Sequence, residues 1–331
     1  MKKIIVILLA CTVLSACSFL SQQDEIEQNI LTEIVETEIV ETDVDEEIVE
    51  EYEIAEDVEV EPEEDIYVRS EETVNINDFT EQEIIELKQR FFTQGVQLNV
   101  SGEIDDDVIT ALKTIALDED LADGVINIDD LLEFFALTDS NFADTSDGYL
   151  MLTNKSLALR YDYVPETTKV VNVDSTKTIY LETETAEAME AMFKAALNDG
   201  IRLVLVSGYR DFDYQNMLFE RKVASIGYED ANKIVARPGE SEHQTGFVAD
   251  VSCSSVGYSL VENFDETQEY QWLAENAANY GFILRYLEDK VDVTGYTYEP
   301  WHYRYVGDVE IAKFITENHL TLEEYHELYM N

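Results

Sequence analysis

Two of the chain's four histidines have neighbours that indicate a metal site. His243 lies in the stretch GESEHQTGFVAD, which ends at Asp250, and His302 lies three residues after Glu299 in YEPWH. Two histidines and one carboxylate form a three-ligand set that leaves a fourth position for water, as in catalytic zinc sites. Bound zinc lowers the pKa of that water, and a nearby carboxylate such as Glu299 can accept its proton. On spacing alone, one histidine in a turn and another packed against Trp301 is the alternative interpretation.

The other histidines and the nearby cysteine are expected to be structural. His319 and His326 lie in the C-terminal segment, where we expect surface or helix-end positions. Cys253 follows Asp250 by three residues, and we expect a small buried apolar side chain there. A fourth protein ligand would close the open position that a catalytic zinc ion needs, so Cys253 is left out of the predicted set.

Strands and helices alternate from Tyr149 to the end of the chain. The strand-like segments are IRLVLVSGYR, GFVADVSCS, GFILRY and WHYRYVG. Helical segments are ETAEAMEAMFKAALNDG, DFDYQNMLFERKVASIG, ETQEYQWLAENAANY and TLEEYHELYM. Short connections between these elements predict one α+β domain over residues 148–331. Because Asp250 falls within a strand, a turn or bulge at Gly246 must bring it beside His243.

A small helical module is predicted over residues 77–138. TEQEIIELKQRFF has apolar residues at helical spacing and a capping box from Thr80 to Glu83, and DDDVITALKTIAL and NIDDLLEFFAL indicate two more helices. The segment loosely resembles peptidoglycan-binding domains of the helical repeat type, through the QG turn at Gln94–Gly95 and the stretches SGEID and DGVI. The resemblance implies a wall-binding module, and a purely structural module is the alternative.

The N-terminus indicates export and lipid attachment. Residues 1–16 begin with Lys2 and Lys3 and continue with an apolar run that is too short to span a bilayer, as in a signal peptide. The ending LSAC resembles a bacterial lipobox, which implies cleavage before Cys17, lipidation of its thiol, and a membrane-anchored location facing the cell wall. An ordinary secretory peptide or an uncleaved anchor is the alternative. Loss of the signal peptide and acylation of Cys17 would leave Cys253 without a disulfide partner.

Residues 17–76 predict a disordered acidic linker. From Ser21 to Glu72 there are 23 acidic residues and one basic residue, Arg69, and the whole chain has a formal net charge of -51. This charge density opposes collapse of the segment. It also repels nucleic acid, which we exclude as a partner, and no obligate protein partner is evident. We expect a spacer between membrane and wall, with an acidic tail that binds a partner or cations as the alternative.

Four motifs are similar, in order, to the VanY-type D-alanyl-D-alanine carboxypeptidases. They are SGYR, PGESEHQTGFVAD, WLAENAANYGFILRY and TGYTYEPWHYRYVG. LTNKSLALRYDYVPETT resembles the opening of the same domain, so the similarity covers roughly Tyr149 to Tyr325. The resemblance implies a zinc D,D-peptidase fold of the Hedgehog and VanY type, with a small central mixed or antiparallel sheet flanked by helices.

The resemblance also implies roles for individual residues. Those that match functional positions of the family are the Zn²⁺ ligands His243, Asp250 and His302, the general base Glu299, the oxyanion-stabilising Arg210, and the substrate-side residues Ser241 and Gln215. Arg210 is permanently cationic and can donate two hydrogen bonds to charge that develops on a carbonyl oxygen. The ordinary alternative for Arg210 is a surface ion pair.

Two residues depart from the family's pattern. Asp211 stands where serine is usual, and it can cap the following helix equally well while adding negative charge near the substrate. Val248 replaces a small residue two positions before Asp250. The resemblance implies zinc-dependent removal of the C-terminal D-amino acid from peptidoglycan stem peptides. Cleavage of an L,D bond in tetrapeptides, an endopeptidase, and a non-catalytic wall-binding lipoprotein are the alternatives.

Overall fold

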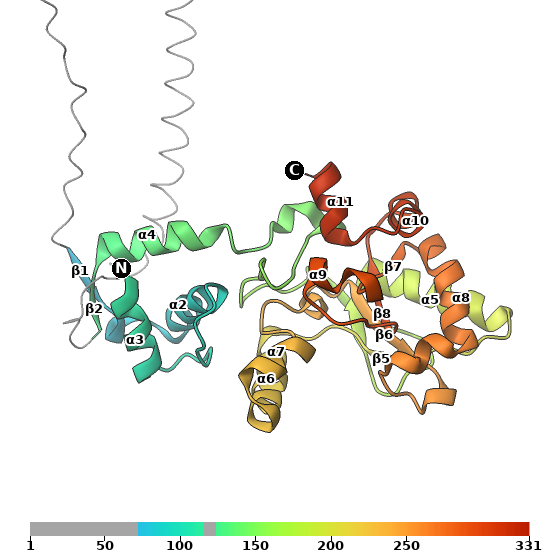
Figure 1. Cartoon of the computed structure of the whole chain (residues 1–331), viewed down its shortest axis with the longest axis horizontal. Helices are drawn as coiled ribbons and strands as arrows, with labels where there is room; N and C mark the ends of the chain where they lie inside the picture. Colours follow the sequence, from blue (N-terminus) through green and yellow to red (C-terminus); the bar gives the residue numbers. More distant parts are fainter. Residues whose placement is uncertain (1–71, 116–123, 331) are drawn as a thin grey trace, which may run out of the picture. The chain divides into compact units, whose positions relative to one another are not determined.

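The computed structural model describes residues 72–115 and 124–330 (Figure 1). The predicted signal peptide, the lipidation site at Cys17 and nearly all of the predicted linker lie outside these residues. Within the described ranges, no helix is long and apolar enough to cross a bilayer. These ranges belong to one unit, Glu71–Asn331.

Short strands and helices alternate along the described chain. The strands are β1 Thr73–Asn75, β2 Val125–Asn127, β3 Thr168–Val170, β4 Tyr180–Glu182, β5 Val204–Ser207, β6 Val248–Ser252, β7 Phe282–Leu284 and β8 His302–Tyr305. The helices are α2 Glu81–Thr93, α3 Asp106–Ile115, α4 Ile128–Asp139, α5 Thr183–Asn198, α6 Phe212–Ile226, α7 Tyr228–Ile234, α8 Gln268–Asn276, α9 Val291–Thr294, α10 Val309–Glu317 and α11 Leu322–Tyr329.

A four-stranded antiparallel sheet underlies the predicted metal ligands. Its strand order is β5-β6-β8-β7. The predicted α+β fold is therefore confirmed, and this sheet is antiparallel rather than mixed. Ala249 and Val251 of β6 and Tyr303 of β8 join an apolar core with residues of α5 and α8. Because side chains alternate across a strand, Asp250 and His302 lie on the opposite face.

Capping residues fix the start of α2 and the start of α6. The predicted capping box of Thr80 and Glu83 is present at the start of α2. Asp211 caps α6 by accepting a hydrogen bond from the backbone N–H of Tyr214. The departure from serine at this position therefore preserves the start of the helix that carries Gln215.

Two small antiparallel pairs, β1 with β2 and β3 with β4, are not apparent from the sequence pattern. A three-residue strand is too short to show the alternation by which strands are recognised. The predicted linker boundary at residue 76 is consequently too late, because Thr73–Asn75 already form β1. The strand pairs with Val125–Asn127, far along the chain, and this partner is invisible in the local sequence.

The helical module packs on the C-terminal α+β domain within the same unit. An apolar cluster joins α2 and the following loop to α6 and α7, and its buried members are Phe92, Val100, Phe212, Phe219 and Ala231. The buried side chain of Gln89 donates to the carbonyl of Leu159 at 2.7 Å and accepts from the N–H of Tyr161 at 3.0 Å. Arg237 donates to the carbonyl of Phe92 at 3.0 Å. Apolar contact and hydrogen bonding thus both tie the module to the domain.

Candidate metal centre and active-site cleft

His243 lies in a short 3-10 helix, Glu242–Thr245, that leads into β6. Its Nδ1 lies 2.6 Å from the carbonyl oxygen of Gly208. A proton on Nδ1 is donated to that carbonyl, which leaves the Nε2 lone pair available to a metal. Nε2 lies 3.4 Å from Oδ2 of Asp250. The turn expected at Gly246 is present, and its φ of 76° lies in the left-handed region that favours glycine.

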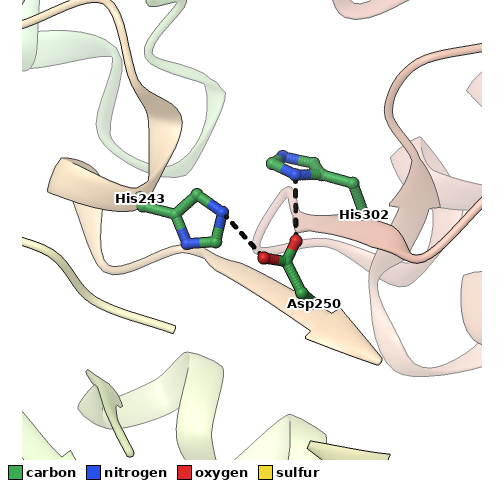
Figure 2. Close-up of side chains that lie close together, drawn as sticks. All are labelled: His243, Asp250 and His302. Atoms are coloured by element: carbon green, nitrogen blue, oxygen red, sulfur yellow. Dashed lines mark ion pairs between the residues drawn. The ribbon is translucent and has the colours of Figure 1, made fainter. Parts of the chain in front are cut away.

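Strand pairing brings Asp250 and His302 together. The two residues are direct partners in the antiparallel ladder of β6 and β8. Nδ1 of His302 lies 3.2 Å from Oδ1 of Asp250. Figure 2 shows the rings of His243 and His302 on either side of the Asp250 carboxylate. All three residues are buried, and one ligand atom from each lies within 4.8 Å of the others.

The donor set fits a catalytic zinc ion. Two imidazole nitrogens and one carboxylate oxygen are common zinc ligands, and three protein ligands leave a position for water or substrate. Oδ1 of Asp250 is buried and has no hydrogen-bond partner within the described ranges, so a metal would satisfy it. Cys253 belongs instead to the apolar core on the other face of the sheet. The expectation of a buried apolar cysteine is confirmed.

The pKa values of the two buried histidines are shifted in opposite directions. Burial lowers the pKa of His243 to about 4, and the charge of Arg210 acts in the same direction. Burial also disfavours the charged form of His302, but neighbouring carboxylates, Asp250 first among them, raise the pKa of His302 well above its usual range. For Asp250 burial is outweighed by the histidines, which lower its pKa well below the usual value.

Glu299 and Arg210 line the same cleft as the three candidate ligands, and its volume is about 490 Å³. Oε2 of Glu299 lies 3.3 Å from Nδ1 of His302. Arg210 donates from Nη1 to Ser207 Oγ at 3.2 Å and from Nη2 to Ser241 Oγ at 3.4 Å. Its Nε is buried without a hydrogen-bond partner among the described residues. The guanidinium is thus held from one edge and has a donor left for another group.

Gln215 and Ser241 also line the cleft. Gln215 is buried, and its Nε2 donates to the carbonyl of Ala236 at 2.7 Å. Its Oε1 has no partner within the part of the chain that the structure describes, and it remains an available acceptor. The structure therefore brings both predicted substrate-side residues to the wall beside Arg210.

Cationic residues of α6 that the sequence analysis missed extend this wall. Arg221 and Lys222 line the cleft on the helix that carries Gln215. Gln215, Leu218 and Lys222 lie at positions i, i+3 and i+7, the spacing of one helical face, so helical periodicity offered a signal for Lys222. In a chain with a net charge of -51, a wall with these cations favours an anionic ligand.

Comparisons with known proteins match the domain that contains this cleft. The family model described as "VanY: D-alanyl-D-alanine carboxypeptidase" matches residues 178–308. YodJ of Bacillus subtilis (strain 168) is 44% identical over 186 residues, which cover 55% of this chain and 68% of that protein. The bifunctional D-Ala-D-Ala dipeptidase and D-Ala-D-Ala carboxypeptidase VanXYC of Enterococcus gallinarum is 38% identical, with coverage of 54% and 93%. A solved structure of the LdcB LD-carboxypeptidase is 41% identical and has a TM-score of 0.54, with coverage of 57% and 95%.

Proposed function

Because the chain belongs to the VanY family of D-alanyl-D-alanine carboxypeptidases, we propose that it removes the C-terminal D-amino acid from peptidoglycan stem peptides. The protein is a carboxypeptidase of a zinc-dependent family. One observation carries the proposal: His243, Asp250 and His302 converge in a single cleft that Glu299 and Arg210 also line.

The mechanism that we propose gives each of these residues a separate task. Zinc would be held by His243 Nε2, the Asp250 carboxylate and His302 Nδ1. When bound, it polarises the scissile carbonyl and lowers the pKa of the attacking water. Glu299 accepts the proton of that water and passes it to the leaving amine. Arg210 donates hydrogen bonds to the oxyanion that develops on the carbonyl oxygen.

The cleft wall would orient the substrate. The free Oε1 of Gln215 can accept a hydrogen bond from a substrate N–H, and Ser241 supports Arg210 through its hydroxyl. Arg221 and Lys222 lie on the same wall and favour a stem peptide that carries carboxylates.

Cleavage of an L,D bond in tetrapeptide stems is the second candidate function. The likeness to the LdcB LD-carboxypeptidase, at 41% identity, favours it. The two reactions require the same metal, base and oxyanion donor. They differ in the residue that precedes the scissile bond, and therefore in the shape of the cleft around it.

A peptide-cleavage assay separates the two candidates. Purified protein with zinc is incubated with a defined pentapeptide stem and a defined tetrapeptide stem, and the products are weighed by mass spectrometry. Loss of one alanine from the pentapeptide supports the D,D activity, whereas loss from the tetrapeptide alone supports the L,D activity. Release from neither peptide would overturn the proposed function.

We also propose that Cys17 is lipidated and that the acidic residues between Cys17 and β1 are a spacer between the membrane and the enzyme. The proposal rests on the LSAC motif and on the acidic composition that follows it. The Cys17→Ala variant should lose incorporation of a labelled fatty acid and leave the membrane fraction of the cells that produce it. Unchanged labelling of that variant would contradict the assignment.

A further inference from the structure

Glu242 is adjacent to His243 in sequence, yet its side chain faces the other histidine. It is buried, with 1% of its surface exposed, and its Oε2 lies 3.6 Å from Nε2 of His302. Among the described residues, neither of these buried atoms has a hydrogen-bond partner. We propose that Glu242 is a positioning residue that accepts a hydrogen bond from the Nε2–H of His302 and so reserves Nδ1 for the metal. This inference rests on the proposed metal site.

The position of the His302 proton decides whether the ring can bind a metal. A neutral imidazole carries one proton, and only the unprotonated nitrogen has a lone pair to share. Nδ1 faces Asp250 at 3.2 Å and Glu299 at 3.3 Å, so it is the nitrogen on the metal side of the ring. The proton must then be on Nε2, where Glu242 Oε2 is the carboxylate oxygen opposite. Histidines that bind metals usually donate their second N–H to such a partner.

Two buried arginines fix the orientation of the Glu242 carboxylate. Its Oε1 accepts from Arg285 Nε at 2.8 Å and from Arg304 Nη1 at 2.6 Å. Both guanidinium groups are fully buried. With Oε1 held from two sides, Oε2 is left turned toward His302.

The sheet holds both arginines on the His302 face. Arg304 is two residues after His302 in β8, so alternation places it on the same face. Arg285 follows directly after β7, and its backbone N–H donates to the carbonyl of His302 at 3.2 Å. The parts that orient Glu242 thus belong to the strand that carries His302 and to the neighbouring strand.

The remaining partners of Arg285 and Arg304 complete a charge-balanced network around Glu242. Arg285 makes a bidentate pair with Glu323 of α11 at 2.8 and 2.7 Å. Arg304 donates its other hydrogen bonds to the carbonyls of Tyr149, Met151 and Tyr305. The two arginines are therefore matched by two carboxylates, as burial of charge requires.

A purely structural role for Glu242 would be to neutralise the two arginines. Oε1 alone makes both hydrogen bonds to the arginines, so this role leaves Oε2 buried and unpaired. An unpaired buried acceptor costs about 1–3 kcal/mol. A hydrogen bond from His302 removes that cost, and it explains why the two atoms without partners face each other.

The test compares the zinc affinities of two isosteric variants of the full chain by chelator competition. In Glu242→Gln, the amide oxygen can stay with the arginines, which turns the amide NH₂ toward His302 and favours a proton on Nδ1. We expect Glu242→Gln to bind zinc about 10- to 100-fold more weakly than wild type, the usual effect of losing such a partner. Glu323→Gln removes a charge from the same network without touching His302. We expect its zinc affinity to stay within about threefold of wild type.

Other results of the zinc measurements would contradict either the role of Glu242 or the metal site itself. A folded Glu242→Gln protein, judged by near-UV circular dichroism, with the zinc affinity of wild type would overturn the inference. Equal losses of affinity in both variants would also overturn it, because they would reflect a shared loss of stability. A wild-type protein that binds no zinc would instead contradict the proposed metal site.

A second measurement needs no variant. In zinc-loaded wild-type protein with ¹⁵N-labelled histidine, long-range proton–nitrogen correlations identify which ring nitrogen of His302 carries the proton. We expect the proton on Nε2. A proton on Nδ1 would overturn the inference even if Glu242→Gln does not fold.

Discussion

At the residue scale, the role of the proposed general base can be tested without removing a proposed zinc ligand. Glu299 lies 3.3 Å from His302 Nδ1, but the group of described side chains that could hold a metal consists of His243, Asp250 and His302. We expect Glu299→Gln to lower turnover of a stem peptide by about 100- to 10,000-fold, the usual contribution of a general base. Zinc content should be unchanged because no ligand is removed. Alanine release and elemental analysis of the protein measure the two quantities.

The exposed Glu310 provides the control for that variant, since its side chain is 85% exposed and pairs only with Lys313 among the contacts described. Glu310→Gln should retain both turnover and zinc. Loss of zinc from Glu299→Gln would show that Glu299 is a ligand. Turnover close to that of wild type would show that it is not the base.

The residues of the candidate site could be identified from sequence to different degrees. His243, Asp250, His302 and Glu299 belong to long motifs, so they could be named before any contact was known. Glu242 could not be assigned a partner, because the histidine that it faces is not its neighbour in sequence. Its arginine partners are 43 and 62 residues away, and only the folded sheet brings them to it.

At the scale of elements, the turn between His243 and Asp250 depends on Gly246. Its φ is 76°, and an added Cβ would lie 3.1 Å from the backbone nitrogen of Glu182 and from Cγ of Pro165. We expect Gly246→Ala to lower the free energy of unfolding by more than the roughly 1–2 kcal/mol of left-handed strain alone. Zinc affinity should fall as well, because the turn sets the distance between two ligands. Urea unfolding and zinc titration measure these effects.

Gly257 is a matched control for backbone strain. Its φ is 64°, and an added Cβ would meet nothing within 4 Å. Gly257→Ala should therefore lose stability through strain alone and keep its zinc affinity. Equal losses of stability in the two variants would contradict the importance of the close approach at Gly246.

The first turn of α11 is tied to the end of β7 by the pair of Glu323 and Arg285. Burial opposes ionisation of Glu323, but Arg285 outweighs it and lowers the pKa of Glu323 below its ordinary 4.5. A carboxyl whose pKa is depressed by folding stabilises the protein above its unfolded pKa and loses this effect as the pH falls through the folded value. We expect Glu323→Gln to be less stable than wild type at pH 7 by about 1–3 kcal/mol.

The difference in stability between wild type and Glu323→Gln depends on pH. Wild type should lose its advantage over Glu323→Gln progressively once the pH falls below the unfolded value near 4.5. Urea unfolding of both proteins over a pH series measures the difference. A gap that stays constant below this value would show that ionisation of Glu323 does not stabilise the fold.

The elements were easier to predict than their pairing. The strands β5, β6 and β8 stand out because branched and aromatic residues cluster in them, and α5 and α6 because their periodicity extends over several turns. The pairing of Asp250 with His302 is a contact between segments far apart in the chain. Local composition carries no information about such a register, so the sequence predicted the ligands without their geometry.

At the scale of the whole molecule, the helical module shares hydrogen bonds with the catalytic domain. Gln89 of α2 satisfies the carbonyl of Leu159 and the N–H of Tyr161. Gln89→Ala would leave both backbone groups without this partner, and we expect a loss of about 1–3 kcal/mol for each group that stays unpaired. Urea unfolding of the purified protein measures the change. Wall binding by residues 77–138 stays a prediction.

Gln94 lies at the end of the same helix with an exposed side chain, and it serves as the control. Gln94→Ala should be close to wild type in stability. A Gln89→Ala protein as stable as Gln94→Ala would show that the two hydrogen bonds of Gln89 do not stabilise the junction between module and domain.

Because Asp250 and His302 are direct partners in the ladder, metal binding depends on the register between β6 and β8. A slip of one residue between β6 and β8 would turn one ligand to the opposite face of the sheet. Only the native register can then hold an ion between the two strands. An ion that binds the native state alone shifts the folding equilibrium toward it. Metal binding therefore stabilises only chains in which β6 and β8 have the native register, because a chain with misaligned strands cannot bind the ion.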